Sequence, residues 1–216
     1  MRKLCWVMCF LGVLVSLVPV SWAGDDSVVK SLIEARSTVT AVPFPSAAMP
    51  DLTLDKAYMV QKDLAKAIIA KGDTIRGFKP ALTSEAGQKQ FGMDQPLLAP
   101  LFASGELGPD AAVDPKLFVR LFIETEVGYV AGRKIDKPVR DVDELKNMIS
   151  EVFPAVELPD IRFKTMKGIT GPDIVADAIG SARYIVGKRI PADQVDVSEV
   201  KVTLTHNGEV VNTGKA

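Results

Sequence analysis

Apolar residues recur at helical spacing in two segments of the first third of the chain. The first segment, residues 25–36, predicts a short amphipathic helix. The second predicts a helix that Thr53 caps and that runs to Lys71, where Gly72 can end it in a left-handed conformation. Three prolines between the two helices predict an extended connector, because proline fixes its own φ and disfavours helix at the residue before it. These are Pro43, Pro45 and Pro50.

Beyond residue 72 the apolar runs become short or alternate with polar residues, which predicts strands. Strands are expected over 73–82, 118–130 and 152–158, with an apolar stretch over 96–102 and helices over 143–148 and 173–186. The pair Asn207-Gly208 lies between two alternating runs and predicts a β-hairpin, since both turn residues must adopt positive φ. Helices first and strands later indicate one α+β domain whose sheet is substantially antiparallel.

The first 23 residues have the pattern of an export signal. Arg2 and Lys3 precede an unbroken apolar run that ends in Ser21-Trp22-Ala23, which predicts a secretory signal peptide cut after Ala23. The mature domain is then 24–216, and the protein is exported to the periplasm or secreted. An uncleaved membrane anchor is the alternative, and an intact-mass measurement on exported protein separates the two. No later apolar run approaches the roughly 20 residues that a membrane helix needs.

Charge and cysteine content narrow the classes of function. The full chain has a net charge of −1, and removing Arg2 and Lys3 leaves 24 basic against 27 acidic side chains, a net of −3. That balance gives no support to nucleic-acid binding, which needs a clustered positive surface. Both cysteines lie in the signal, and His206 is the only histidine, next to the predicted hairpin turn. The mature chain therefore offers no readable Ser/His/Asp or Cys/His nucleophile set.

Three carboxylates stand out against their apolar surroundings. Glu124 and Glu126 are two residues apart in a predicted strand, so they point to the same side. Glu157 ends the apolar run of another strand. Carboxylates this close repel one another, and a hard divalent cation such as Mg²⁺, Mn²⁺ or Ca²⁺ would relieve that repulsion. The simpler alternative is that this face is solvated and the glutamates are ordinary surface residues.

Several ordered segments resemble the 2-keto-4-pentenoate hydratase group. They are Gly77-Phe78-Lys79-Pro80-Ala81-Leu82-Thr83-Ser84, Gly92-Met93-Asp94-Gln95-Pro96, Glu124-Thr125-Glu126, Val156-Glu157-Leu158-Pro159-Asp160, Ile174-Val175-Ala176-Asp177 and Asn212-Thr213-Gly214. The group includes 2-oxo-hepta-3-ene-1,7-dioate hydratases and 4-oxalocrotonate decarboxylases, and it belongs to the fumarylacetoacetate hydrolase superfamily. The similarity runs from about Ile33 to Lys215. It implies a mixed β-sheet roll or barrel with flanking helices, like the C-terminal domain of that superfamily.

The resemblance also implies roles for individual residues. Glu124, Glu126 and Glu157 match three metal ligands for Mg²⁺ or Mn²⁺, while Lys79 and Asp94 match pocket residues that shuttle protons or orient water. The implied reaction is a hydro-lyase step of aromatic catabolism, in which water adds to a 2-hydroxy-2,4-dienoate to give a 4-hydroxy-2-oxo acid. Decarboxylation of a 2-oxo dicarboxylate is the alternative. Solvated-loop roles for Lys79 and Asp94 stay open. The partners expected are a small 2-oxo or 2-hydroxydienoate acid and further copies of the chain, with no nucleic acid and, after cleavage, no membrane.

Two features depart from the family pattern. Ala178 follows Asp177 where the family usually has Asn, so a side-chain amide near the pocket is missing. The family also continues for several tens of residues past the segment that Asn212 begins, so C-terminal elements of the sheet are expected to be missing. These departures, with the export signal, motivate a third hypothesis. In it the chain is a catalytically silent exported relative that acts as a binding module.

Overall fold

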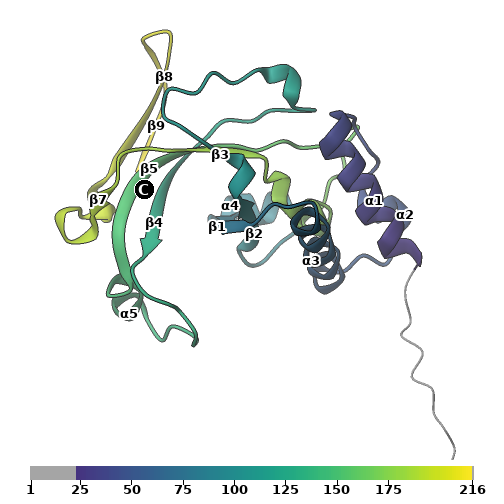
Figure 1. Ribbon diagram of the computed structural model, residues 1–216, viewed down its shortest axis with the longest axis horizontal. Coiled ribbons are helices and arrows are strands. Elements are labelled where there is room, and N and C mark those ends of the chain that lie inside the picture. Colours follow the sequence, from purple (N-terminus) through teal and green to yellow (C-terminus); the bar gives the residue numbers. More distant parts are fainter. Residues whose placement is uncertain (1–22, 216) are drawn as a thin grey trace, which may run out of the picture.

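The computed structural model describes residues 23–215 and contains a helical body from which a curved β-ribbon projects (Figure 1). The predicted signal peptide, with Cys5 and Cys9, lies outside the described residues except for Ala23, the first residue of α1. Within the described range, none of the helices combines the length and apolarity that crossing a membrane requires.

The helical body contains the two predicted helices and a third, shorter one. These are α1 (Ala23–Thr38), α3 (Leu54–Ala70) and α2 (Pro45–Ala48). The cap of α3 is confirmed, because the Thr53 hydroxyl accepts from the Lys56 amide, and Gly72 follows with φ of +99°. The expected connector is extended only in part, since α2 lies within it. Pro45 occupies the first helical position of α2, where its fixed φ suits a helix and its missing N–H costs nothing.

The helix expected over 173–186 is wrong beyond its first turns. Only α6 (Gly171–Ala176) is α-helical, a 3₁₀ turn follows over Ala178–Gly180, and strand β6 (Arg183–Val186) completes the segment. Ala178 and Ile179 have φ of +50° and +51°, which breaks the right-handed helix. The apolar spacing was genuine, but it covered a short buried helix and a buried turn together.

The strands form three sheets among the described residues. The hairpins are β1 (Ile75–Ala81) with β2 (Leu97–Phe102), and β8 (Lys201–His206) with β9 (Glu209–Lys215). The main sheet has the order β3-β6-β5-β4, and β7 also pairs with β5. Its other strands are β3 (Glu106–Leu107), β4 (Glu124–Ala131), β5 (Ile149–Leu158) and β7 (Ile190–Pro191). Because β3 and β6 are parallel and the other pairs antiparallel, this sheet is mixed.

One predicted strand is shorter than expected, and one helix was not predicted. Strand β4 starts at Glu124 rather than at residue 118, although a bridge between Leu121 and Asp160 continues the same register. The short helix α5 (Val142–Lys146) lies where one was expected. Helix α4 (Glu85–Gln90) was not predicted, and the Ser84 hydroxyl caps it by accepting from the Gly87 amide.

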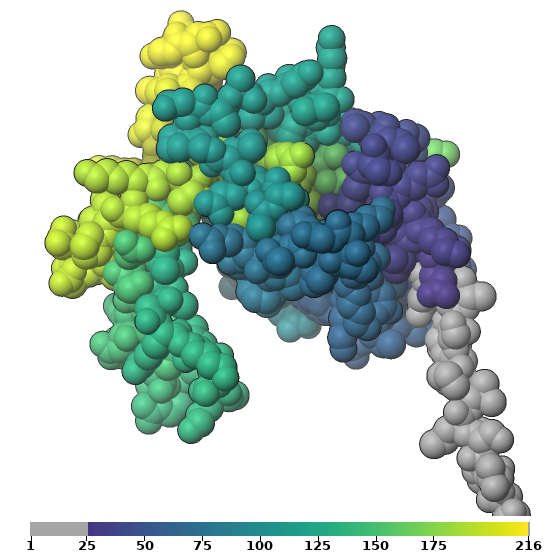
Figure 2. All heavy atoms as spheres, viewed as in Figure 1, coloured from purple at the N-terminus to yellow at the C-terminus, as the bar shows by residue number. Residues whose placement is uncertain are grey.

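The hydrophobic core lies between the helices and the β1–β2 hairpin. Its buried members come mainly from α1, α3, β2 and α6, and they include Leu32, Val60, Leu64, Leu97, Phe163 and Val175. The β4–α5–β5 arm extends away from this core, and Figure 2 shows open space between the arm and the body. The α+β class is therefore confirmed, with helices and core on one side and a curved mixed sheet on the other.

Candidate functional site

The register of the main sheet brings the three predicted glutamates to one face. Glu124 of β4 lies directly opposite Glu157 of β5, and opposite residues in a ladder share a face. Glu126 lies two residues further along β4, so it shares that face as well. The sequence placed Glu124 and Glu126 together from their spacing, whereas the strand pairing adds Glu157.

Lys79 approaches this face from the β1–β2 hairpin. Its Nζ lies 2.5 Å from Glu157 Oε1 and donates to the carbonyl of Ile179 at 3.0 Å. Lys79 and Glu157 are each only 6% exposed, so this is a buried ion pair. The carbonyl is available because the left-handed turn at Ala178 and Ile179 directs it toward β1. A solvated-loop role for Lys79 is thereby excluded.

The carboxylates shift one another's protonation. Glu124 and Glu126 are both exposed, but partial desolvation of Glu126, together with the charge of Glu124, raises the pKa of Glu126 above its ordinary value. Burial also raises the pKa of Glu157, assisted by the charges of Glu124 and Glu126, even though Lys79 acts in the opposite direction. The face therefore carries negative charge that a single lysine does not fully neutralise.

The donor chemistry suits a hard cation, but the side chains are not arranged around one. Carboxylate oxygens are the preferred ligands of Mg²⁺ and Ca²⁺. As the side chains stand, no group of three or more His, Cys, Asp or Glu within residues 23–215 lies close enough to hold a metal ion. Glu157 is directed toward Lys79 instead. The backbone thus brings the three acids to one face, while the Glu157 side chain pairs with Lys79.

Asp94, the other predicted pocket residue, is not joined to the glutamates. It lies exposed in the loop between α4 and β2. In the described part of the chain its side chain forms no hydrogen bond or ion pair. Its proposed role in proton transfer therefore stays a prediction.

Tyr184 extends the cross-strand row and was not singled out from the sequence. It lies opposite Glu157 in β6, and Glu106 of β3 follows it in the same row. The Tyr184 hydroxyl donates to the Phe102 carbonyl at 3.2 Å, and burial, with the nearby Glu106 charge, raises its pKa to about 12. This residue is a neutral hydrogen-bonding group beside the carboxylates. The expectation of a helix over 173–186 concealed it, because only a strand aligns it with Glu157.

Comparisons with known proteins place this geometry in context. No family model matches the chain. The 2-keto-4-pentenoate hydratase of Paraburkholderia xenovorans is 29% identical over 190 residues, which is 88% of this chain and 70% of the relative. A 4-oxalocrotonate decarboxylase of Pseudomonas putida is 30% identical over 166 residues, covering 76% of this chain and 62% of the relative.

Solved structures agree with these relatives. The 4-oxalocrotonate decarboxylase from Pseudomonas putida G7, complexed with magnesium and adipate, has a TM-score of 0.84 and 27% identity. The match covers 88% of this chain and 73% of that protein. The same enzyme complexed with calcium and acetate has a TM-score of 0.83, 26% identity and coverage of 88% and 72%. The predicted resemblance is thus confirmed, and the chain is a homologue of the 2-keto-4-pentenoate hydratases and 4-oxalocrotonate decarboxylases of the fumarylacetoacetate hydrolase superfamily.

Proposed function

We propose that the protein is a metal-dependent hydratase that adds water to a 2-hydroxy-2,4-dienoate and produces a 4-hydroxy-2-oxo acid. The observation that carries this proposal is the face on which Glu124, Glu126 and Glu157 meet, with Lys79 against Glu157. The curated hydratase relatives supply the reaction class. The mixed sheet and its flanking helices are accordingly part of a fumarylacetoacetate hydrolase-type roll, in agreement with the TM-score of 0.84.

The three glutamates are the proposed ligands of Mg²⁺ or Mn²⁺. Their common face and the raised pKa of Glu126 and Glu157 support this assignment, because a divalent cation relieves the repulsion that causes part of those shifts. The magnesium and calcium complexes of the decarboxylase neighbour agree with it. When bound, the ion would supply positive charge at the oxygens of the substrate's 2-oxo acid group.

Three other side chains have proposed roles beside the metal ligands. The Lys79 ammonium is fixed by Glu157 and the Ile179 carbonyl, so it presents a positively charged donor to an anionic substrate. Asp94 is the proposed group that accepts a proton from the attacking water, in the loop that precedes β2. The Tyr184 hydroxyl, in the same cross-strand row as Glu157, stays protonated at neutral pH, since its pKa is about 12.

An assay with 2-hydroxypenta-2,4-dienoate tests the proposal. The purified protein with Mg²⁺ or Mn²⁺ is expected to form the 4-hydroxy-2-oxo acid, and EDTA is expected to abolish the reaction. Glu126→Gln should lose most activity. The control is Glu151→Gln, which should keep its activity, because Glu151 lies on the same β5 strand as Glu157 but forms an exposed ion pair with Arg189. Absence of hydrated product with either metal would contradict the hydratase assignment.

Decarboxylation is the second candidate, because the structural match is to a 4-oxalocrotonate decarboxylase. The same assay with a 2-oxo dicarboxylate distinguishes it, since release of CO₂ without hydrated product indicates the decarboxylase. A protein that binds Mg²⁺ yet transforms neither acid would favour the silent binding module.

Export and self-association complete the proposal. Cleavage after Ala23 should give exported protein whose mass begins at Gly24, and a mass that begins at Met1 would contradict it. Phe78 and Leu98 are 62% and 49% exposed on the β1–β2 hairpin, and exposed apolar groups of this size favour association between copies. Light scattering on the purified protein should therefore report a mass above that of one chain.

A further inference from the structure

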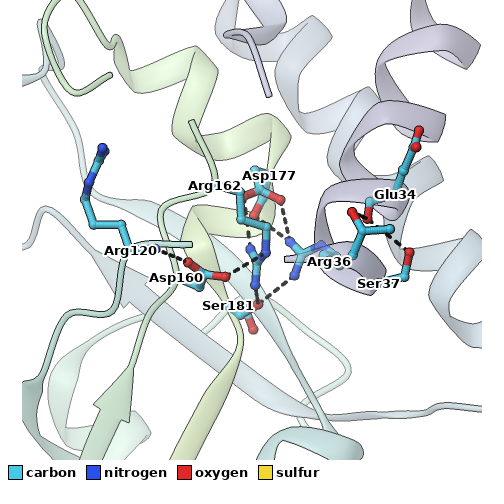
Figure 3. A network of polar contacts seen from close by, with 9 residues as sticks. Glu34, Arg36, Ser37, Arg120, Asp160, Arg162, Asp177 and Ser181 are labelled. Carbon is cyan, nitrogen blue, oxygen red and sulfur yellow. Dashed lines mark hydrogen bonds and ion pairs between the residues drawn. The ribbon is translucent and has the colours of Figure 1, made fainter. Parts of the chain in front are cut away.

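A buried cluster of charged groups lies away from the glutamates, where α1 meets the turn after α6. Arg36 Nη2 and Arg162 Nη1 both contact the Asp177 carboxylate, at 2.6 and 3.0 Å. Both guanidinium groups also donate to the Ser181 carbonyl, at 2.8 and 3.3 Å (Figure 3). Asp160 approaches Arg162 Nε at 3.3 Å. Two arginines thus share one carboxylate and one carbonyl in the interior.

The hydrogen bonds leave part of this cluster unsatisfied. The Nε atom of Arg36 is buried and has no hydrogen-bond partner among the described residues, whereas the buried Nε of Arg162 lies in an ion pair with Asp160 without a well-aligned hydrogen bond. Burial, and then the neighbouring Arg162 charge, lower the pKa of Arg36 to about 10. A guanidinium normally has a pKa above 12, so burial, assisted by the Arg162 charge, disfavours the charged form of Arg36 even though Asp177 and Asp160 favour it.

A cavity of about 510 Å³ opens onto the cluster. Its cationic lining consists of Arg36, Lys71, Arg162 and Arg183, against two acids, Asp73 and Asp160. Asp73 is already engaged, because its carboxylate accepts from the hydroxyl and amide of Ser104. Within residues 23–215 neither Lys71 nor Arg183 forms an ion pair. Arg183 is held by the Ser104 carbonyl, to which its Nη1 donates at 2.9 Å, and its charge acts on Asp73. The four cations of the lining still outnumber its two acids.

The rest of the lining is apolar, and the cavity lies behind the sheet. Ile33, Ile68, Phe102 and Phe118 line it. Arg183 pairs with Leu158, one position from the pair of Tyr184 with Glu157, so Arg183 points to the opposite face from the glutamates. A molecule in this cavity would not contact the proposed metal ligands.

We propose that this cavity binds a small organic anion, a carboxylate with an apolar body, at a site separate from the glutamate face. The carboxylate lies between Lys71 and Arg183 near Arg36, where it adds negative charge to a lining with four cations and two acids. Its apolar body packs against Ile68 and Phe102. The volume fits such a molecule, since small-ligand pockets commonly measure about 300–1,000 Å³. Inorganic phosphate has the charge but lacks the apolar body.

Titration of the metal-free protein with benzoate in EDTA tests the proposal. Benzoate is expected to bind saturably, and benzyl alcohol and inorganic phosphate are each expected to bind at least about tenfold more weakly. Arg183→Met and Lys71→Met keep an apolar stem and remove one charge, so each should weaken benzoate binding by about tenfold. Lys66→Met, on the exposed side of α3, is the matched control and should leave binding unchanged. In methyl spectra, benzoate should shift the signals of Ile33 and Ile68.

Each other outcome overturns the proposal. Absence of saturable benzoate binding to the folded parent protein would exclude the site. Melting curves check that the variants are folded before their binding is compared. Equal binding of benzyl alcohol would exclude a role for the charge, and equal binding of phosphate would exclude the apolar body. If Glu126→Gln weakens benzoate binding and Arg183→Met and Lys71→Met leave it unchanged, benzoate binds at the glutamate face instead.

Discussion

At the scale of single residues, the negative charge of Glu126 is expected both to destabilise the metal-free protein and to bind the proposed metal ion. Glu126→Gln keeps the side-chain size and removes one negative charge from the proposed ligand set. The metal-free variant should be at least as stable as the metal-free parent, because repulsion with Glu124 disappears. A cation that binds only the folded parent stabilises it, by about 2.7 kcal/mol at a hundred times its dissociation constant. Thermal melts with and without Mg²⁺ should show that the variant loses most of this gain, and equal gains would exclude Glu126 as a ligand.

The carboxyl groups of Glu126 and Glu157 should make the stability of the metal-free protein depend on pH. A group whose pKa is raised on folding binds protons more tightly in the folded state, so its cost is absent below the unfolded pKa and grows as pH rises. Burial and neighbouring charges raise the pKa of Glu126 and Glu157 above 4.5. In EDTA, these groups should make the protein more stable at about pH 5 than at pH 7. Urea unfolding at both pH values should show a smaller difference in Glu126→Gln, and identical differences would contradict this origin.

Ala178 lowers stability in a different way, through strain in its backbone conformation. Its φ of +50° is strained for any residue with a Cβ, by roughly 1–2 kcal/mol. Ala178→Gly removes that strain and should raise the free energy of unfolding by about 1 kcal/mol. Ala176→Gly is the control, because this neighbouring buried alanine is helical and glycine there costs about 1 kcal/mol. Denaturant unfolding should therefore give opposite signs, and destabilisation by both would contradict the strain argument.

At the scale of elements, the β4–β5 arm depends on a glycine beneath an aromatic ring. Gly128 lies opposite Phe153, and a Cβ at Gly128 would come within 2.1 Å of that ring. Gly128→Ala must displace the ring, which also lies near the Arg189 guanidinium, so the substitution should cost about 1–3 kcal/mol. Gly77→Ala in β1 meets nothing within 4 Å and should be nearly neutral. Urea unfolding of the two variants checks the contrast, and equal stabilities would contradict it.

The sequence predicted elements correctly where a local signal marks their ends or turns. Helix α3 has its Thr53 cap and the β8–β9 hairpin has its Asn207-Gly208 turn, so local signals determined both. Periodicity failed over residues 173–186 because α6 and the left-handed turn are buried and β6 is at least half-buried, so apolar residues follow one another without the spacing of a single element. The candidate site shows the same limit. Spacing joined Glu124 to Glu126, but only strand register and the carbonyl of Ile179 bring Glu157 and Lys79 to them.

At the scale of the whole molecule, burial is unevenly distributed. The core joins α1, α3, β2 and α6, whereas the β4–α5–β5 arm contributes few buried side chains. The arm projects from the helical body (Figure 1). The β8–β9 hairpin contributes fewer still, because every residue of β9 is exposed and β8 has only Val202 and Leu204 half-buried. Stability should therefore reside mainly in the helical body, and the two arms should open independently of it.

Removal of the hairpin tests that distribution. A two-stranded hairpin is at best marginally stable in water, and this one buries almost none of its surface on the body. Ending the chain after Val200 should therefore change the free energy of unfolding by less than about 1 kcal/mol, whereas Leu64→Ala in the core should cost about 2–5 kcal/mol. Hydrogen exchange on the intact protein should agree, with fast exchange in β8 and β9 and slow exchange in α3. A truncation as costly as Leu64→Ala, or protected hairpin amides, would mean that the hairpin is packed against a surface of this protein, such as that of a second copy in solution.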